Sequence, residues 1–140
     1  MKTVKRVAYV ERGKGKGNFS CFAPEPIGTF GLAGYGKTAR EAMADIRLTV
    51  QEYKEMEAGE GREFPDVDFD FRLDVGSFFD YYPIDVTAFA KYIGMNASVL
   101  RQYIASLREP RESQVMKIRE GIKLFASDLA HGLPLEQPAV

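Results

Sequence analysis

The chain has 140 residues, of which 45% are apolar and 28% are charged, and its net charge is −1. This apolar fraction is sufficient for the core of one domain or two small ones, which excludes an intrinsically disordered chain. The near-zero net charge excludes a protein that coats nucleic acid over its whole surface, because such proteins are strongly basic.

Cysteine usage and hydropathy restrict where the protein works. Cys21 is the only cysteine, so the chain cannot form an internal disulfide. No apolar run is as long as a membrane span or forms the core of a secretion signal. We therefore expect a soluble, cytoplasmic protein that has no membrane partner.

Two short strands joined by a flexible turn are predicted at the start of the chain. Residues 4–11 are rich in Val and Tyr, residues 13–18 are rich in Gly and Lys, and residues 19–23 are again mostly apolar. This pattern is typical of a β-hairpin. Residues 29–35 predict a third strand.

A helix and a fourth strand follow the predicted hairpin. Thr38 is a typical N-cap residue, and Glu41 three positions later completes a capping box. The helix is supported by residues at helical spacing, which are Ala39, Ala42, Met43, Ile46, Val50, Tyr53 and Met56. Residues 66–75 alternate between apolar and mostly acidic side chains, which predicts a strand with one buried face. Such a strand adds most readily in parallel after a crossover helix, so residues 1–75 predict a small α+β layer.

The rest of the chain predicts an all-α unit. Residues 76–83 are too aromatic for a loose linker, and we expect them to pack as a short helix or turn. Residues 84–132 have the pattern of a helix-turn-helix, with a small Ala90 where two helices would cross and Gly94 at the turn. The inward positions of this pair are Phe89, Ile93, Met95, Leu100 and Tyr103. A last helix is predicted with Val115, Ile118, Ile122, Phe125 and Leu129 on one face, and residues 133–140 are predicted to be a flexible tail.

The second helix of this pair has a polar outer face, which is typical of a helix that reads DNA. The predicted base-reading residues are Asn96, Ala97, Ser98, Arg101 and Gln102. Arginine pairs bidentately with guanine and glutamine with adenine in the major groove, while Asn96 also suits a helix cap. Arg108 and Arg111 in the next loop are predicted to bind phosphates, which positions the helix without reading sequence. We expect at least a dimer, because one short recognition helix rarely holds DNA alone.

The segment from residue 52 to residue 74 is strongly acidic. Asp66, Asp68 and Asp70 share one face of the predicted fourth strand. Such a face is most often only solvated, yet it also suits a basic protein partner. These three aspartates are therefore our candidate partner-binding residues.

The initial hairpin, the helix opening at residues 36–46 and the helix-turn-helix ending at residues 100–103 together resemble the HicB-type antitoxins. The resemblance covers nearly the whole chain. It implies a partial ribonuclease-H-like domain over residues 1–75 that binds and masks a small basic mRNA-cleaving toxin of the HicA type. It also implies that residues 84–132, similar to the Cro and λ-repressor type, repress the operon's own promoter as a homodimer or higher homo-oligomer.

Enzymatic alternatives are disfavoured on physical grounds. Residues 31–38 match the P-loop pattern literally, but a P-loop enzyme needs a Mg²⁺-positioning carboxylate on a second, fully buried strand, whereas the later strand alternates Asp with Phe. A two-metal nuclease needs carboxylates that converge from several elements, which Glu11, Glu41 and one strand face do not supply. His131, the only histidine, has no ligand or base partner near it in sequence. We therefore predict no enzyme activity, no cofactor and no metal.

Two functions stay open from sequence. One is an antitoxin that binds a toxin and represses its own operon. The other is a stand-alone helix-turn-helix transcriptional regulator whose N-terminal domain binds a ligand or a protein. A short reading frame for a basic protein beside this gene would favour the first, and its absence would favour the second.

Overall fold

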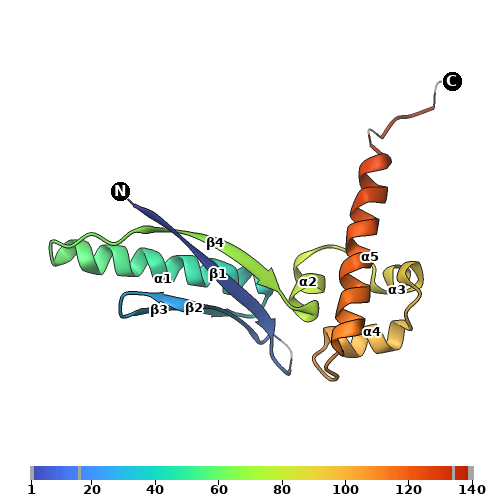
Figure 1. The fold of residues 1–140 in the computed structure, drawn as a ribbon, viewed down its shortest axis with the longest axis horizontal. Coiled ribbons are helices and arrows are strands. Elements are labelled where there is room, and N and C mark those ends of the chain that lie inside the picture. The colour runs from blue at the N-terminus through green and yellow to red at the C-terminus, as the bar shows by residue number, and fades with distance from the viewer. Residues whose placement is uncertain (1, 16, 134, 139–140) are drawn as a thin grey trace.

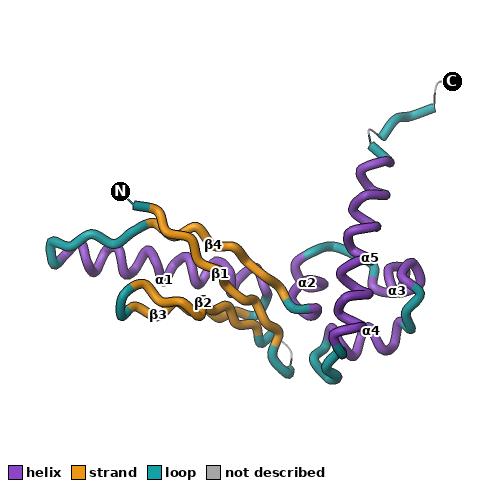
Figure 2. Tube along the Cα trace, viewed as in Figure 1, coloured by secondary structure: helices purple, strands orange, loops and turns teal. Residues whose placement is uncertain are grey.

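The computed structural model describes residues 2–15, 17–133 and 135–138. Within these ranges the chain forms a mixed α+β fold, as predicted, with the elements arranged along it as in Figures 1 and 2. The elements are β1 (Thr3–Arg12), β2 (Phe19–Ile27), β3 (Phe30–Gly36), α1 (Ala39–Gly59), β4 (Asp66–Leu73), α2 (Val75–Tyr81), α3 (Val86–Ile93), α4 (Ala97–Ile104) and α5 (Glu112–His131).

The four strands form one mixed sheet in the order β3-β2-β1-β4. Strand β2 pairs antiparallel with both β1 and β3, whereas β4 pairs parallel with β1. The prediction that the strand after the crossover helix adds in parallel is therefore confirmed. The prediction that this strand reaches Val75 is wrong, because Asp74 caps α2: its Oδ1 accepts a hydrogen bond of 2.8 Å from the Ser77 amide.

Helix α1 covers one face of the sheet (Figure 1). It begins as predicted, since Thr38 Oγ1 accepts from the Glu41 amide at 3.0 Å. The Glu41 carboxylate accepts from the Lys37 amide at 2.7 Å, one residue before the N-cap amide of the usual capping box. The buried residues of this first cluster are Ala8, Val10, Phe19, Cys21, Ala23, Leu32, Ala39, Ala42, Met43, Ile46, Val50 and Phe64.

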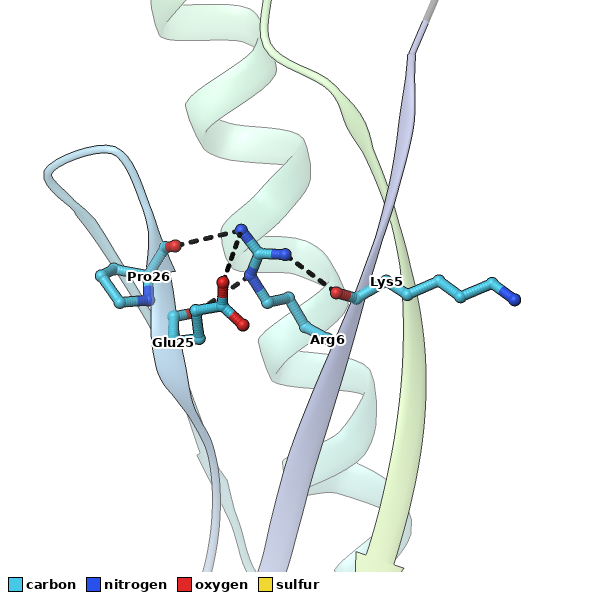
Figure 3. Close-up of polar contacts among 4 residues, drawn as sticks. All are labelled: Lys5, Arg6, Glu25 and Pro26. Atoms are coloured by element: carbon cyan, nitrogen blue, oxygen red, sulfur yellow. Dashed lines mark hydrogen bonds and ion pairs between the residues drawn. The ribbon is translucent and has the colours of Figure 1, made fainter.

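An arginine from β1 supports the sheet where β2 becomes irregular. The register of β2 against β3 shifts between Ala23 and Ile27, and the pairing of β2 with β1 extends only as far as Phe22. Figure 3 shows Arg6 reaching from β1 to this part of β2, where it donates to the carbonyls of Glu25 at 3.1 Å and Pro26 at 3.2 Å. These bonds satisfy carbonyl groups that the broken strand pairing leaves unpaired.

The chain has a second hydrophobic cluster, whose buried residues are Phe89, Ala90, Leu100, Tyr103 and Ile118. Helix α2 lies between the two clusters: Tyr81 packs against the first, while Val75 and Phe79 pack against the second. The Phe79 ring lies 5.4 Å from that of Phe89. The aromatic connector therefore forms a short helix, as predicted, and its aromatic residues hold the sheet and the α-helical part together.

Helix α5 packs only along part of its length. Ile118 is buried, and Val115, Ile122 and Phe125 are half-buried, as the amphipathic pattern predicts. The placement of Leu129 on the packed face is wrong, because its side chain is 58% exposed. Helices α3 and α4 have eight residues each, so the end of the 20-residue α5 extends past them (Figure 1). Of the predicted tail at 133–140, residues 134, 139 and 140 lie outside the described residues.

Candidate nucleic-acid interface

Helices α3 and α4 are joined by the tight turn that the sequence predicts. Gly94 ends α3 with φ of 71°, a left-handed conformation that favours glycine. Ala90 is fully buried at the contact between the helices, and its carbonyl accepts from the Met95 amide at 2.8 Å. The short side chain at Ala90 lets the chain fold back closely, so the two helices share one apolar cluster.

The N-terminus of α4 is fixed by Asn96. Its side-chain oxygen accepts from the amides of Ser98 at 2.8 Å and Val99 at 3.2 Å. The predicted cap is thus confirmed. Leu100 and Tyr103 are buried on the inner face of α4, and this sets which residues face outward.

The predicted base-reading residues occupy different environments. Ser98 and Arg101 are exposed, Gln102 is half-buried, and Ala97 is half-buried against the second cluster. Arg101 donates a hydrogen bond through Nη2 to Thr87 Oγ1 at the start of α3. Thr87 was not predicted from sequence, because its pairing with Arg101 depends on how the two helices cross.

Several cations lie around this face. Arg108 and Arg111 are exposed in the loop before α5, as predicted. The Arg108 guanidinium lies 6.0 Å from the centre of the Tyr103 ring, a cation–π distance. Lys117 of α5 donates to the Gly94 carbonyl at 3.0 Å. Lys117 therefore places a positive charge at the turn between α3 and α4, while Arg108 and Arg111 lie in the loop that follows α4.

The three candidate partner-binding aspartates lie along β4, at an edge of the sheet. All three are exposed, and their alternation with half-buried residues confirms the predicted one-sided strand. Asp66 forms an ion pair with Lys54, and Asp70 lies 3.0 Å from Arg72. Asp68 stands opposite Lys5 of β1 in the strand register. Their charge is thus partly offset by neighbouring cations.

The sheet face opposite α1 carries a feature that the sequence reasoning missed. Tyr9 and Phe22 pair across β1 and β2 with their rings 5.9 Å apart, and each is 38% exposed. The period-two register places them on the same face as Asp68 and Asp70. Alternation within β1 was the available signal, since Lys5, Tyr9 and Glu11 are exposed while Ala8 and Val10 are buried.

The stretch that matches the P-loop pattern has a different structural role. Its glycines lie in strand β3, and a Cβ added at Gly34 would stand 2.4 Å from the Ile46 amide nitrogen of α1. At the start of α1, the Ala39 amide donates to the Asp80 carboxylate at 2.8 Å. Side-chain oxygens of the chain itself therefore occupy amides that would have to face a phosphate.

Other groups that carry chemistry in many proteins are not assembled into a site. Burial raises the pKa of the Cys21 thiol to about 12, so it stays protonated at neutral pH. His131 is exposed, and its Nδ1 lies 2.8 Å from the Ser127 carbonyl. Across the described ranges, no group of three His, Cys, Asp or Glu side chains is placed to hold a metal ion. No helix that the structure describes combines the length and apolar character of a membrane span.

The geometry described above is the basis for a functional proposal, because the comparisons with known proteins identify no relative of this chain. No family model matches the chain, no curated protein matches it, and no solved structure matches it.

Proposed function

We propose that the chain is a sequence-specific DNA-binding regulator of the antitoxin type. In this proposal α3 and α4 form a helix-turn-helix, and α4 lies in the major groove. The sheet and α1 form a partial ribonuclease-H-like domain that binds a basic protein partner, a toxin of the HicA type. The protein acts in the cytoplasm as a homodimer or higher homo-oligomer and represses its own operon.

The observation that carries the DNA-binding part is the exposure of Ser98 and Arg101 on a short helix whose inner face is buried. Leu100 and Tyr103 fix the rotation of α4, and Asn96 fixes where it begins. A helix held in this way presents its first turns to a groove, which is how recognition helices meet base edges. The cations at Arg108 and Arg111, in the loop that follows α4, then suit phosphates of the DNA backbone.

The partner-binding part is supported by the uncovered sheet face. It combines the Tyr9–Phe22 pair with the exposed aspartates of β4, whose charge Lys5 and Arg72 offset only in part, and exposed aromatic side chains beside charged groups are typical of protein interfaces. A second candidate, a regulator that responds to a small ligand, is favoured by a cavity of about 750 Å³ between the sheet and the α-helical part.

Changing Arg101 to alanine is expected to weaken binding to the operator by about 1–3 kcal/mol and to relax sequence preference, because a base contact is lost. Arg108→Ala should instead weaken binding to all duplexes alike. It should also reduce the slope of log affinity against log salt concentration by about one. Fluorescence anisotropy with a duplex from the gene's upstream region, and a scrambled duplex beside it, measures both effects.

Arg47→Ala is the matched control for these two changes. Arg47 is an exposed arginine of α1, the helix that packs on the sheet and does not belong to the proposed helix-turn-helix. This variant should leave DNA affinity unchanged. Loss of specific binding with Arg101→Ala alone supports the groove assignment. Equal affinity for the operator and the scrambled duplex in the unmodified protein would contradict it.

Reversing the charge at Asp68 and Asp70 together is expected to weaken the complex with a basic protein encoded beside this gene, because opposite charges across the interface would become like charges. The same two-site reversal at Glu52 and Glu60 is the control, as both are exposed carboxylates that lie outside β4. Titration calorimetry would measure the dissociation constants. An unchanged constant for the Asp68 and Asp70 variant would place the interface elsewhere.

A further inference from the structure

A cavity of about 750 Å³ lies where the end of the sheet meets the helices. Its wall is built from the ends of β1 and β4, from α2, from the end of α4, from the loop before α5 and from α5 itself. Figures 1 and 2 show α2 between the sheet and these helices. The volume falls in the range of pockets that enclose small organic ligands.

The two sides of the cavity are held together by specific polar contacts. Arg12 at the end of β1 donates through Nη1 to the Ile104 carbonyl at 3.0 Å. In return, Ser106 Oγ donates to the Arg12 carbonyl at 2.8 Å. Ser106 holds the left-handed φ of 58°, which is unfavourable for a serine and needs such contacts to persist. The cavity is therefore part of the packed structure and not a gap between loosely tethered units.

The wall of the cavity carries more positive than negative charge. Its cations are Arg12, Lys14, Arg108, Arg119 and Lys123, and its carboxylates are Glu11, Asp74 and Glu109. Asp74 is already engaged, since its two oxygens accept from the amides of Arg12 and Ser77. Among the described residues, neither Arg108 nor Arg119 forms an ion pair with a carboxylate.

One donor in this wall has no acceptor. The Nε of Arg12 is buried and has no hydrogen-bond partner among the described atoms. This nitrogen is shielded from solvent, so it adds positive charge to the wall without contacting a ligand itself. The groups that can reach an anion are the exposed guanidiniums of Arg108 and Arg119.

The rest of the wall is apolar and aromatic. Phe78, Phe79 and Tyr103 contribute rings, and Val75, Ile118 and Ile122 contribute aliphatic surface. Arg108 lies beside the Tyr103 ring, so a charged group and a flat apolar surface are adjacent. A ligand that combines one anionic group with a flat aromatic body would match both parts.

We propose that this cavity binds a small aromatic organic anion and that the bound anion weakens DNA binding. The second part rests on the proposed DNA-binding function. Tyr103 belongs to α4 and Arg108 belongs to the proposed phosphate contacts, so the ligand and DNA compete for the same guanidinium. By linkage, the ligand lowers DNA affinity by the same factor as DNA lowers ligand affinity.

Titration calorimetry on the full chain tests the binding site without DNA. The probes are AMP and indole-3-acetate, which represent the two sources of an aromatic anion, a phosphate and a carboxylate. Adenosine and indole-3-acetamide are their uncharged counterparts. We expect one of the two anions to bind and its uncharged counterpart to bind at least about tenfold more weakly, as loss of a charge-assisted hydrogen bond implies. Failure of both anions to bind, or equal binding of the uncharged compounds, overturns the site.

The variant that locates the ligand is Arg119→Gln, because Arg119 lines the cavity and is exposed on α5 outside the proposed DNA contacts. Its ligand dissociation constant should rise about tenfold, whereas Lys5→Gln, with the same charge change on β1, should leave it unchanged. Equal effects of the two variants overturn the assignment to this cavity.

DNA anisotropy with and without the bound anion then tests the coupling. A several-fold loss of operator affinity in the unmodified protein, absent in Arg119→Gln at the same ligand concentration, supports it. An unchanged operator affinity at saturating ligand overturns the coupling. If the chain binds no DNA at all, the proposed function fails, while calorimetry still decides whether the cavity binds the anion.

Discussion

Gly34→Ala is expected to lower the free energy of unfolding by about 3 kcal/mol or more, the upper part of the range for overpacking a close contact. A Cβ at this position would lie 2.4 Å from the Ile46 amide nitrogen and 2.7 Å from the Ala42 carbonyl oxygen. Both atoms belong to the backbone of α1, which cannot rotate away as a side chain does. Either α1 must move off β3 or the strand must distort.

Gly31→Ala is the matched control, because it makes the same chemical change in the same strand. A Cβ at Gly31 meets nothing within 4 Å, so its effect on stability should be within about 0.5 kcal/mol. Denaturant unfolding followed by far-UV circular dichroism measures both. If Gly31→Ala were as damaging as Gly34→Ala, the close approach of α1 to β3 would not explain the glycines of this strand.

The same pair of variants bears on the P-loop resemblance. A phosphate-binding loop needs the first and last glycines of its pattern, which here are Gly31 and Gly36. The structure instead packs Gly34, a variable position of that pattern, and Gly36 closely against α1, while Gly31, the first glycine of the pattern, has open space around it. The glycine content of this segment follows from the contact between a helix and a strand, which a short sequence pattern cannot distinguish from a phosphate loop.

Local signals in the sequence predicted most of the elements. Thr38 and Glu41 marked the start of α1, strict alternation marked β4, and Gly94 marked the turn between α3 and α4. In each case the residues that indicate the element in the sequence also make the local contacts that form it, and these residues lie close together in the chain. The end of β4 was predicted two residues late, because Val75 continues the apolar alternation although Asp74 already caps the next helix.

Contacts between distant residues had no such signal. Arg12 bonds to Ile104 and Ser106 across 92 and 94 positions, and no periodicity within β1 or α4 indicates these partners. Similarly, the bond from Arg101 to Thr87 depends on how α3 crosses α4. The cavity and the immediate surroundings of the candidate interface therefore emerge only from the three-dimensional arrangement. The exposure of Ser98 and Arg101 on α4 was predicted from sequence, whereas the partial burial of Ala97 and Gln102 was not.

Leu100→Ala is expected to lower the free energy of unfolding by about 2–5 kcal/mol, because truncation of a fully buried leucine loses apolar burial and leaves a cavity. Leu100 belongs to the second cluster and, with Tyr103, forms the buried inner face of α4. Leu107→Ala is the control, since its side chain is 75% exposed and the same truncation there should be nearly neutral.

Denaturant unfolding gives the two stabilities, and hydrogen exchange of the α4 amides shows whether the loss is local to this helix. The expected result is faster exchange in α4 with Leu100→Ala and unchanged exchange with Leu107→Ala. Equal stability of the two variants would mean that burial of Leu100 does not hold α4 in place. The outward direction of Ser98 and Arg101 would then lack its physical basis, since it is the fixed inner face that determines which side chains can enter a DNA groove.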